Sequence, residues 1–222
     1  EGASDGIFAT EELLPMAKIA FPSILQQSTV SIGMMLVQSV VNSFGSQMLA
    51  GYSAAMRVES ICVVPMSAMG NAISSYTAQN IGAGQKDRVR EGYRAVTLMV
   101  LGFATVICLA LELSGDSLAY LFLGADGTPA AMQTAVSCMM FMGWFYCLIG
   151  FKMTADGVLR GAGDMKLFTV ANLVNLGIRV IVAVTMAPRF GIFMVWAAVP
   201  VGWTANWLIS YCRYRTRKWE KR

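Results

Sequence analysis

Five charged residues inside or just beyond long apolar segments are the first candidates for chemistry. Arg57 and Glu59 are two residues apart, so on a helix they point to different faces. Lys152 and Asp156 are four apart, so they can pair, near a segment end where long side chains reach the interface. Arg179 lies in the middle of a later segment. Charges in apolar surroundings are costly and often functional, so these residues predict ion or substrate binding, with interhelical ion pairs as the alternative.

Uncharged polar residues recur on the same helix faces. Gln27, Ser31 and Gln38 are spaced by four and seven residues, and Asn172 and Asn175 stand seven and four residues before Arg179. Glutamine is costly in lipid, so these faces contact protein or water. Interhelical hydrogen bonds and a cavity wall both fit the pattern, and we favour the wall. The predicted cavity residues are Gln27, Gln38, Asn42, Asn172, Asn175 and Arg179.

Several kinds of chemistry are excluded or disfavoured. The 222 residues contain no histidine, which excludes histidine acid–base catalysis and histidine-ligated metals. The five cysteines have no CxxC spacing and lie in apolar runs, as small buried side chains do. No paired-carboxylate or Ser-His motif is present, so we predict no enzyme activity, no metal and no cofactor.

These residues must be positioned by long apolar elements. Only 14% of the chain is charged, against about 25% in soluble domains. Six apolar runs cover 22–44, 47–77, 92–112, 129–155, 165–187 and 191–211, and each reaches the ~20 residues that a membrane helix needs. Open strands cannot lie in lipid, so the sequence predicts an all-α membrane protein with six transmembrane helices. Pro65 and Pro200, inside two runs, predict kinks.

The basic residues indicate the orientation of these helices. Thirteen of the seventeen lie before the first run, after the second, fourth and sixth runs, or at the chain end. The connections after the first, third and fifth runs contain a single basic residue, Arg189. Basic residues mark the cytoplasmic side, which predicts a multi-pass protein of the cell (inner or plasma) membrane with both termini in the cytoplasm. Basic residues directly beside apolar spans favour lipid over nucleic acid as the partner.

Two glycine motifs follow the second and fourth runs. Residues 79–84 read QNIGAG and precede a basic stretch, and residues 157–164 read GVLRGAGD. Glycine supplies the positive φ of tight turns after helices. With residues 21–27 (FPSILQQ) and 49–59 (LAGYSAAMRVE), these motifs resemble the C-terminal half of the MATE (multidrug and toxic compound extrusion) family. The resemblance covers nearly the whole chain from about Leu13.

The resemblance implies one six-helix lobe of a two-lobed (6+6) transporter that exports organic cations by proton or sodium antiport. It divides the chain into a cytoplasmic lead-in (1–20), a transmembrane lobe (21–212) and a basic tail (213–222). One branch of the family couples through acids in the first and fourth helices of this lobe. The first run here has no acid, and the fourth has only Asp156, away from mid-membrane. The lobe therefore resembles the DinF-like branch, whose coupling carboxylate lies in the N-terminal lobe.

Other functions and partners remain open at this point. A lipid or lipid-linked oligosaccharide flippase of the same superfamily is one alternative, and a non-transporting membrane assembly subunit is another. The chain begins with Glu1 and not with methionine, so we expect it to be processed or truncated; a fragment and a natural half-size protein both stay open. The expected partners are the lipid bilayer, small amphipathic organic cations, and either an N-terminal lobe of the same transporter or a second copy.

Overall fold

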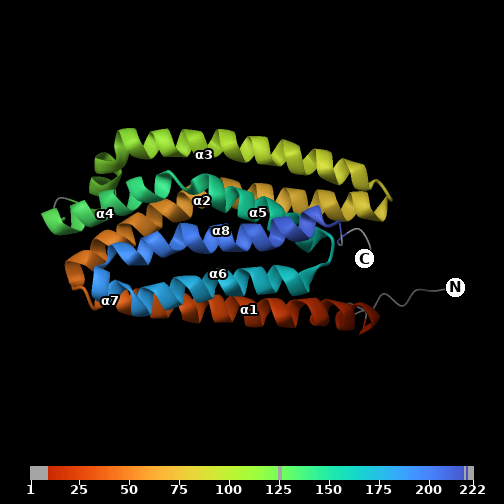
Figure 1. Ribbon diagram of the computed structural model, residues 1–222, viewed down its shortest axis with the longest axis horizontal. Helices are drawn as coiled ribbons and strands as arrows, with labels where there is room; N and C mark the ends of the chain where they lie inside the picture. The colour runs from red at the N-terminus through yellow and green to blue at the C-terminus, as the bar shows by residue number, and fades with distance from the viewer. Residues whose placement is uncertain (1–9, 125–126, 218, 220–222) are drawn as a thin grey trace.

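The computed structural model describes residues 10–124, 127–217 and 219, and this part of the chain is helical without strands. The helices are α1 (Thr10–Asn42), α2 (Ser46–Gly82), α3 (Lys86–Leu123), α4 (Pro129–Gly143), α5 (Tyr146–Gly161), α6 (Met165–Thr185), α7 (Ala187–Phe190) and α8 (Phe193–Arg215). They form one elongated bundle of roughly parallel and antiparallel rods (Figure 1).

The predicted runs correspond to α1, α2, α3, the pair α4–α5, α6 and α8. Two helices of the described chain, α3 and α6, are by themselves long and apolar enough to cross a membrane. The pair α4–α5 also qualifies, as one broken span bent by 54°. The sequence did not predict this break, which follows Gly143 and involves no proline. Pro65 and Pro200, in contrast, stay inside the continuous helices α2 and α8.

Two predicted boundaries fall inside helices. α1 is continuous from Thr10 across position 20, and α8 continues across position 212 to Arg215. Beyond α8, Trp219 is fully buried and its indole donates a hydrogen bond to the Tyr214 carbonyl at 2.8 Å. Arg213 forms an ion pair with the buried Asp164 at 2.6 Å. The end of α8 and Trp219 are therefore packed against the bundle.

The glycine motifs form turns at one end of the bundle. Gly84, between α2 and α3, and Gly163, between α5 and α6, have φ of 72° and 73°, a conformation that favours glycine. Figure 1 places both turns, the start of α1 and the end of α8 at the same end. The connections α1–α2, α3–α4 and α6–α8 lie at the other end. The structure thus gathers the turns rich in basic residues on one side.

Helices α2 and α5 form the tightest part of the bundle. A Cβ atom at Gly157 would clash with the carbonyl of Gly70, and one at Gly161 would clash with the carbonyl of Ser74. These glycines let the two backbones approach closely, as small residues do between membrane helices. Arg160 adds hydrogen bonds from α5 to α2, of which the shortest reaches Asn71 Oδ1 at 2.7 Å.

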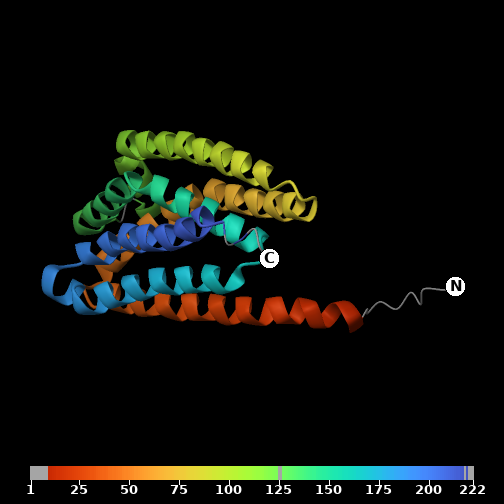
Figure 2. The ribbon, with the colours of Figure 1, turned by 45° about the vertical axis from the view of Figure 1, so that its right-hand side comes forward.

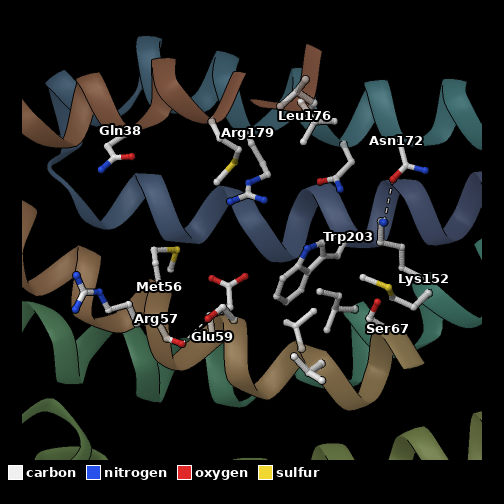
Figure 3. A pocket seen from close by; sticks show the side chains of 18 of the residues that line it. Gln38, Met56, Arg57, Glu59, Ser67, Lys152, Asn172, Leu176, Arg179 and Trp203 are labelled. Atoms are coloured by element: carbon white, nitrogen blue, oxygen red, sulfur yellow. Dashed lines mark hydrogen bonds between the residues drawn. The ribbon is translucent and has the colours of Figure 1, made fainter. Parts of the chain in front are cut away.

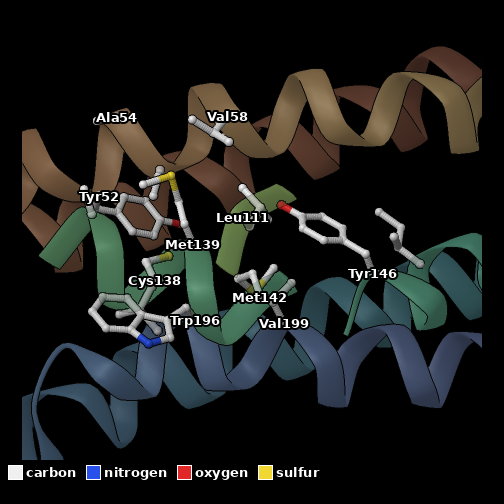
Figure 4. Packing of buried hydrophobic residues seen from close by; sticks show 14 of the residues in the cluster. Tyr52, Ala54, Val58, Leu111, Cys138, Met139, Met142, Tyr146, Trp196 and Val199 are labelled. Carbon is white, nitrogen blue, oxygen red and sulfur yellow. The ribbon is translucent and has the colours of Figure 1, made fainter. Parts of the chain in front are cut away.

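A hydrophobic core lies between α2, α4, α5 and α8 (Figure 4). Tyr52, Cys138, Met142, Tyr146 and Trp196 are buried there. The outer helix α3 instead exposes many large apolar side chains, among them Leu98, Leu113 and Leu121. Such an apolar exterior suits contact with lipid chains.

The remaining helices α1 and α6 run side by side along the opposite edge from α3, as both ribbon views show (Figures 1 and 2). α6 packs most extensively against α8, whereas α2 packs most extensively against α5. The bundle therefore contains an α1–α6 layer and an α2–α5 layer joined by α8, and this arrangement leaves space between the layers.

Candidate functional site

A cavity of about 830 Å³ occupies the space between the two layers (Figure 3). This volume lies in the range of about 300–1,000 Å³ that is typical of small-molecule sites. The side chains that line it come from five helices. They are Val30, Met34, Gln38, Tyr52, Ser53, Met56, Arg57, Glu59, Ser60, Val63, Val64, Ser67, Ile149, Lys152, Met153, Asn172, Asn175, Leu176, Arg179 and Trp203.

Helical spacing places these side chains on the cavity. On α1, Val30, Met34 and Gln38 follow one another at intervals of four residues. On α6, Asn172, Asn175 and Arg179 share one face as their spacing predicted, and all three line the cavity. Gly202 lets α8 approach α6 closely, because a Cβ there would clash with Asn175, and the adjacent Trp203 lines the cavity.

Glu59 and Arg179 lie at the centre of the cavity. Figure 3 shows them pointing toward each other from α2 and α6. Neither an ion pair within 4 Å nor a hydrogen bond joins them in the described chain. Glu59 Oε2 and Arg179 Nε are both buried without a hydrogen-bond partner, as are the Tyr52 hydroxyl and Asn175 Oδ1. Four buried polar atoms around one cavity are groups that water, an ion or a ligand can satisfy.

Lys152 belongs to a buried polar network at one side of the cavity. Its ammonium nitrogen lies 3.2 Å from Asp156 Oδ2 and donates to Asn172 Oδ1 at 3.0 Å. Asp156 also accepts hydrogen bonds from Ser210 at 2.6 Å and from Asn172 at 3.3 Å. The network joins α5, α6 and α8 and holds the lysine in a fixed position on the cavity wall.

The structure confirms the predicted Lys152–Asp156 ion pair. It does not confirm the expectation that the pair lies near a segment end where the lysine reaches the membrane interface. Both residues are buried, with relative exposures of 8% and 5%, so the lysine does not reach toward an interface. The reason is that α5 continues to Gly161 between α2 and α8, and these helices cover its end. Asp156 lies behind Lys152 and outside the cavity lining.

Two predicted cavity residues are outside the cavity. Gln27 and Asn42 on α1 are exposed and do not belong to the lining, whereas Gln38 between them does. Arg57 and Glu59 point in different directions, as expected from their spacing, but both reach the cavity. The lining therefore brings together Gln38, Arg57, Glu59, Lys152, Asn172, Asn175 and Arg179 of the predicted residues.

Sequence analysis missed most of the α2 wall and Trp203. Tyr52, Met56, Glu59, Val63 and Ser67 all line the cavity, and they follow one another at intervals of three or four residues. This spacing on the helix face of Glu59 was the available signal. Trp203 carried no such signal, because α8 is apolar on most of its faces. The described residues contain no cluster of three metal-ligating histidine, cysteine or acidic side chains.

Comparison with known proteins places this architecture in a family. Residues 22–185 match the MatE family. The chain is 30% identical over 217 residues to the "Probable multidrug resistance protein YpnP" of Bacillus subtilis, covering 95% of this chain and 47% of that protein. It is 26% identical over 215 residues to "Probable multidrug resistance protein YoeA" of the same organism, covering 96% and 46%.

A solved structure of a MOP-superfamily transporter from Pyrococcus furiosus superposes with a TM-score of 0.86 at 20% identity, covering 97% of this chain and 49% of that one. The chain thus spans about half the length of the relatives it matches, as one six-helix lobe of a two-lobed transporter does. Because the family match covers residues 22–185, which is most of the chain, this chain belongs to the MatE family of membrane transporters.

Proposed function

We propose that this chain is the C-terminal lobe of an efflux antiporter that exports amphipathic compounds in exchange for protons or sodium ions. The observation that carries the proposal is the cavity between the α1–α6 and α2–α5 layers, where apolar and polar side chains from five helices meet. Two-lobed transporters move a substrate by rocking one repeat against another around a central site. The second wall would come from an N-terminal lobe or from a second copy of this chain.

Organic cations are the proposed substrates, and three lining residues support this. Glu59 supplies a carboxylate, and Tyr52 and Trp203 supply aromatic rings that can stabilise a cation. Among the described residues, Glu59 is the only acid in the cavity lining. We place the coupling carboxylate in the other lobe, as the DinF-like branch does, because Glu59 faces a guanidinium and Asp156 is already bonded to Lys152, Asn172 and Ser210.

A lipid or lipid-linked flippase is the second candidate. The cavity lining includes three basic side chains, those of Arg57, Lys152 and Arg179. Such residues could bind a phosphate headgroup, whereas a purely cationic drug would be repelled by them. The two candidates share the fold, the membrane and the two-lobed mechanism, and they differ in the charge of the substrate.

The test is uptake of rhodamine 123, a fluorescent organic cation, by liposomes that contain the whole protein under an imposed proton or sodium gradient. Gradient-dependent uptake supports antiport. Liposomes with this lobe alone serve as the comparison, and we expect no uptake from them. Uptake by the lobe alone, abolished by Glu59→Gln, would place the coupling site on Glu59 and contradict our assignment.

A further inference from the structure

The charge of the cavity wall indicates a second class of ligand, in addition to the amphipathic cations proposed above. Arg57, Lys152 and Arg179 line the cavity, and Glu59 is the only acid in the part of the lining that the structure describes. Figure 3 shows Arg57 at one side of the view, Arg179 near the middle and Lys152 at the other side. The wall stays net positive even when Asp156, behind Lys152, is counted with it.

Two of the three basic groups are matched by a carboxylate of this lobe. The Lys152 ammonium lies against Asp156 and Asn172, which fix its position. Arg179 faces Glu59, although its Nε is buried without a hydrogen bond.

Arg57 is different from the other two. In the described part of the chain its guanidinium forms no ion pair or hydrogen bond, and its side chain is exposed where it lines the cavity. Glu59 lines the same cavity, but no ion pair within 4 Å joins it to Arg57 in the described residues. A guanidinium offers five donors in a planar fork that matches carboxylate or phosphate oxygens.

We propose that the cavity holds an anion-binding subsite built on Arg57, so that its ligands carry a carboxylate or phosphate group on an amphipathic body. The apolar body would contact Met34, Met56 and Leu176, which line the same cavity. The subsite rests on the proposed transport function for its role, but its existence as a binding site can be tested without transport.

The test uses two dyes with the same xanthene ring system and opposite charge at neutral pH, fluorescein (anionic) and rhodamine 123 (cationic). Binding to the purified whole protein in a non-ionic detergent is measured by fluorescence polarisation, with no ion gradient. We expect fluorescein to bind the wild type. Arg57→Gln should weaken that binding about tenfold, because a charge-assisted hydrogen-bonded contact is lost.

Three controls make the result specific. Arg57→Lys keeps the charge but loses the planar fork, so it should bind fluorescein more tightly than Arg57→Gln and more weakly than the wild type. Arg189→Gln removes an exposed arginine outside the cavity and should leave fluorescein binding unchanged. Rhodamine 123 binding should not weaken in Arg57→Gln. The proposal is overturned if fluorescein does not bind, or if Arg57→Gln and Arg189→Gln bind it equally well.

A competition experiment identifies the source of the anion. Short-chain phosphatidylglycerol and phosphatidylcholine of the same chain length are each tested for displacement of fluorescein. If only phosphatidylglycerol displaces the dye, the natural ligand of the subsite is a lipid headgroup. Absence of displacement assigns it to a soluble organic anion. Gradient-driven uptake is measured separately, so that anion binding without any uptake would refute the proposed transport function and leave the subsite standing.

Discussion

Glu59 on α2 and Arg179 on α6 point toward each other across the cavity, and each keeps a buried polar atom without a hydrogen-bond partner. They come from the two layers that enclose the cavity, which otherwise join mainly through α8. The carboxylate and the guanidinium have opposite charges, so their attraction can hold the two layers together. Because they are not in direct contact, a ligand can also bind between them. This relationship makes the pair the first target for mutation.

A double-mutant cycle should detect this attraction. Glu59→Gln and Arg179→Gln should each lower the melting temperature of the whole protein, and the double variant should be less destabilised than the sum of the two. We expect a coupling free energy of about 1 kcal/mol, within the range found for neighbouring charges. Strictly additive effects on thermal stability would show that the two side chains do not interact.

Lys152→Met should be strongly destabilising. The substitution leaves the buried Asp156 carboxylate without its cation, and breaking a buried pair in this way costs about 3–5 kcal/mol. Changing both residues, as Lys152→Met with Asp156→Leu, should recover much of the lost stability. Thermal unfolding in detergent measures both effects. A single variant as stable as the wild type would mean that Asp156 is not buried in the whole protein.

Gly157→Ala should destabilise the lobe by about 1–3 kcal/mol, the usual range for overpacking. The new Cβ would clash with the Gly70 carbonyl, which is backbone and cannot turn away. Gly102→Ala on α3 is the matched control, because its Cβ would meet nothing within 4 Å. The control should be neutral or slightly stabilising, since alanine has a higher helix propensity than glycine. Equal melting temperatures of the two variants would contradict the close α2–α5 contact.

Cysteine labelling should test the orientation of the bundle. In a background whose five cysteines are replaced, Ser46→Cys and Gln85→Cys each place one thiol at an exposed position at opposite ends of the lobe. We expect an impermeant maleimide added outside intact cells to label position 46 and not position 85, because basic turns stay in the cytoplasm. The reverse labelling pattern would place the termini outside.

Sequence reasoning predicted the helices well, because their signals are local. The start of α4 at Pro129 and the turns at Gly84 and Gly163 depend on residue types that act within one helical turn. The break between Gly143 and Tyr146 could not be predicted in this way, since no proline marks it. It depends on how α4 and α5 pack against other helices.

The candidate site was predicted in part. The spacing of Asn172, Asn175 and Arg179 placed them on one face, and the spacing of Lys152 and Asp156 allowed their ion pair; the structure confirms both. Gln27 and Gln38 share a face of α1, yet only Gln38 reaches the cavity. Periodicity defines the direction of a side chain around its helix, but not which part of that helix is covered by a neighbour.

The sequence by itself determined the apolar helices, the side of the bundle that holds the basic turns, and the polar faces of α1 and α6, because composition and spacing along one chain segment decide each of them. Only the tertiary structure decided that Glu59 faces Arg179, that Asp156 is enclosed behind Lys152, and that Arg57 has no carboxylate partner in the described chain. The physical reason is that the charge balance of a cavity depends on contacts between helices that are distant in sequence, and these contacts exist only after the two layers pack around α8.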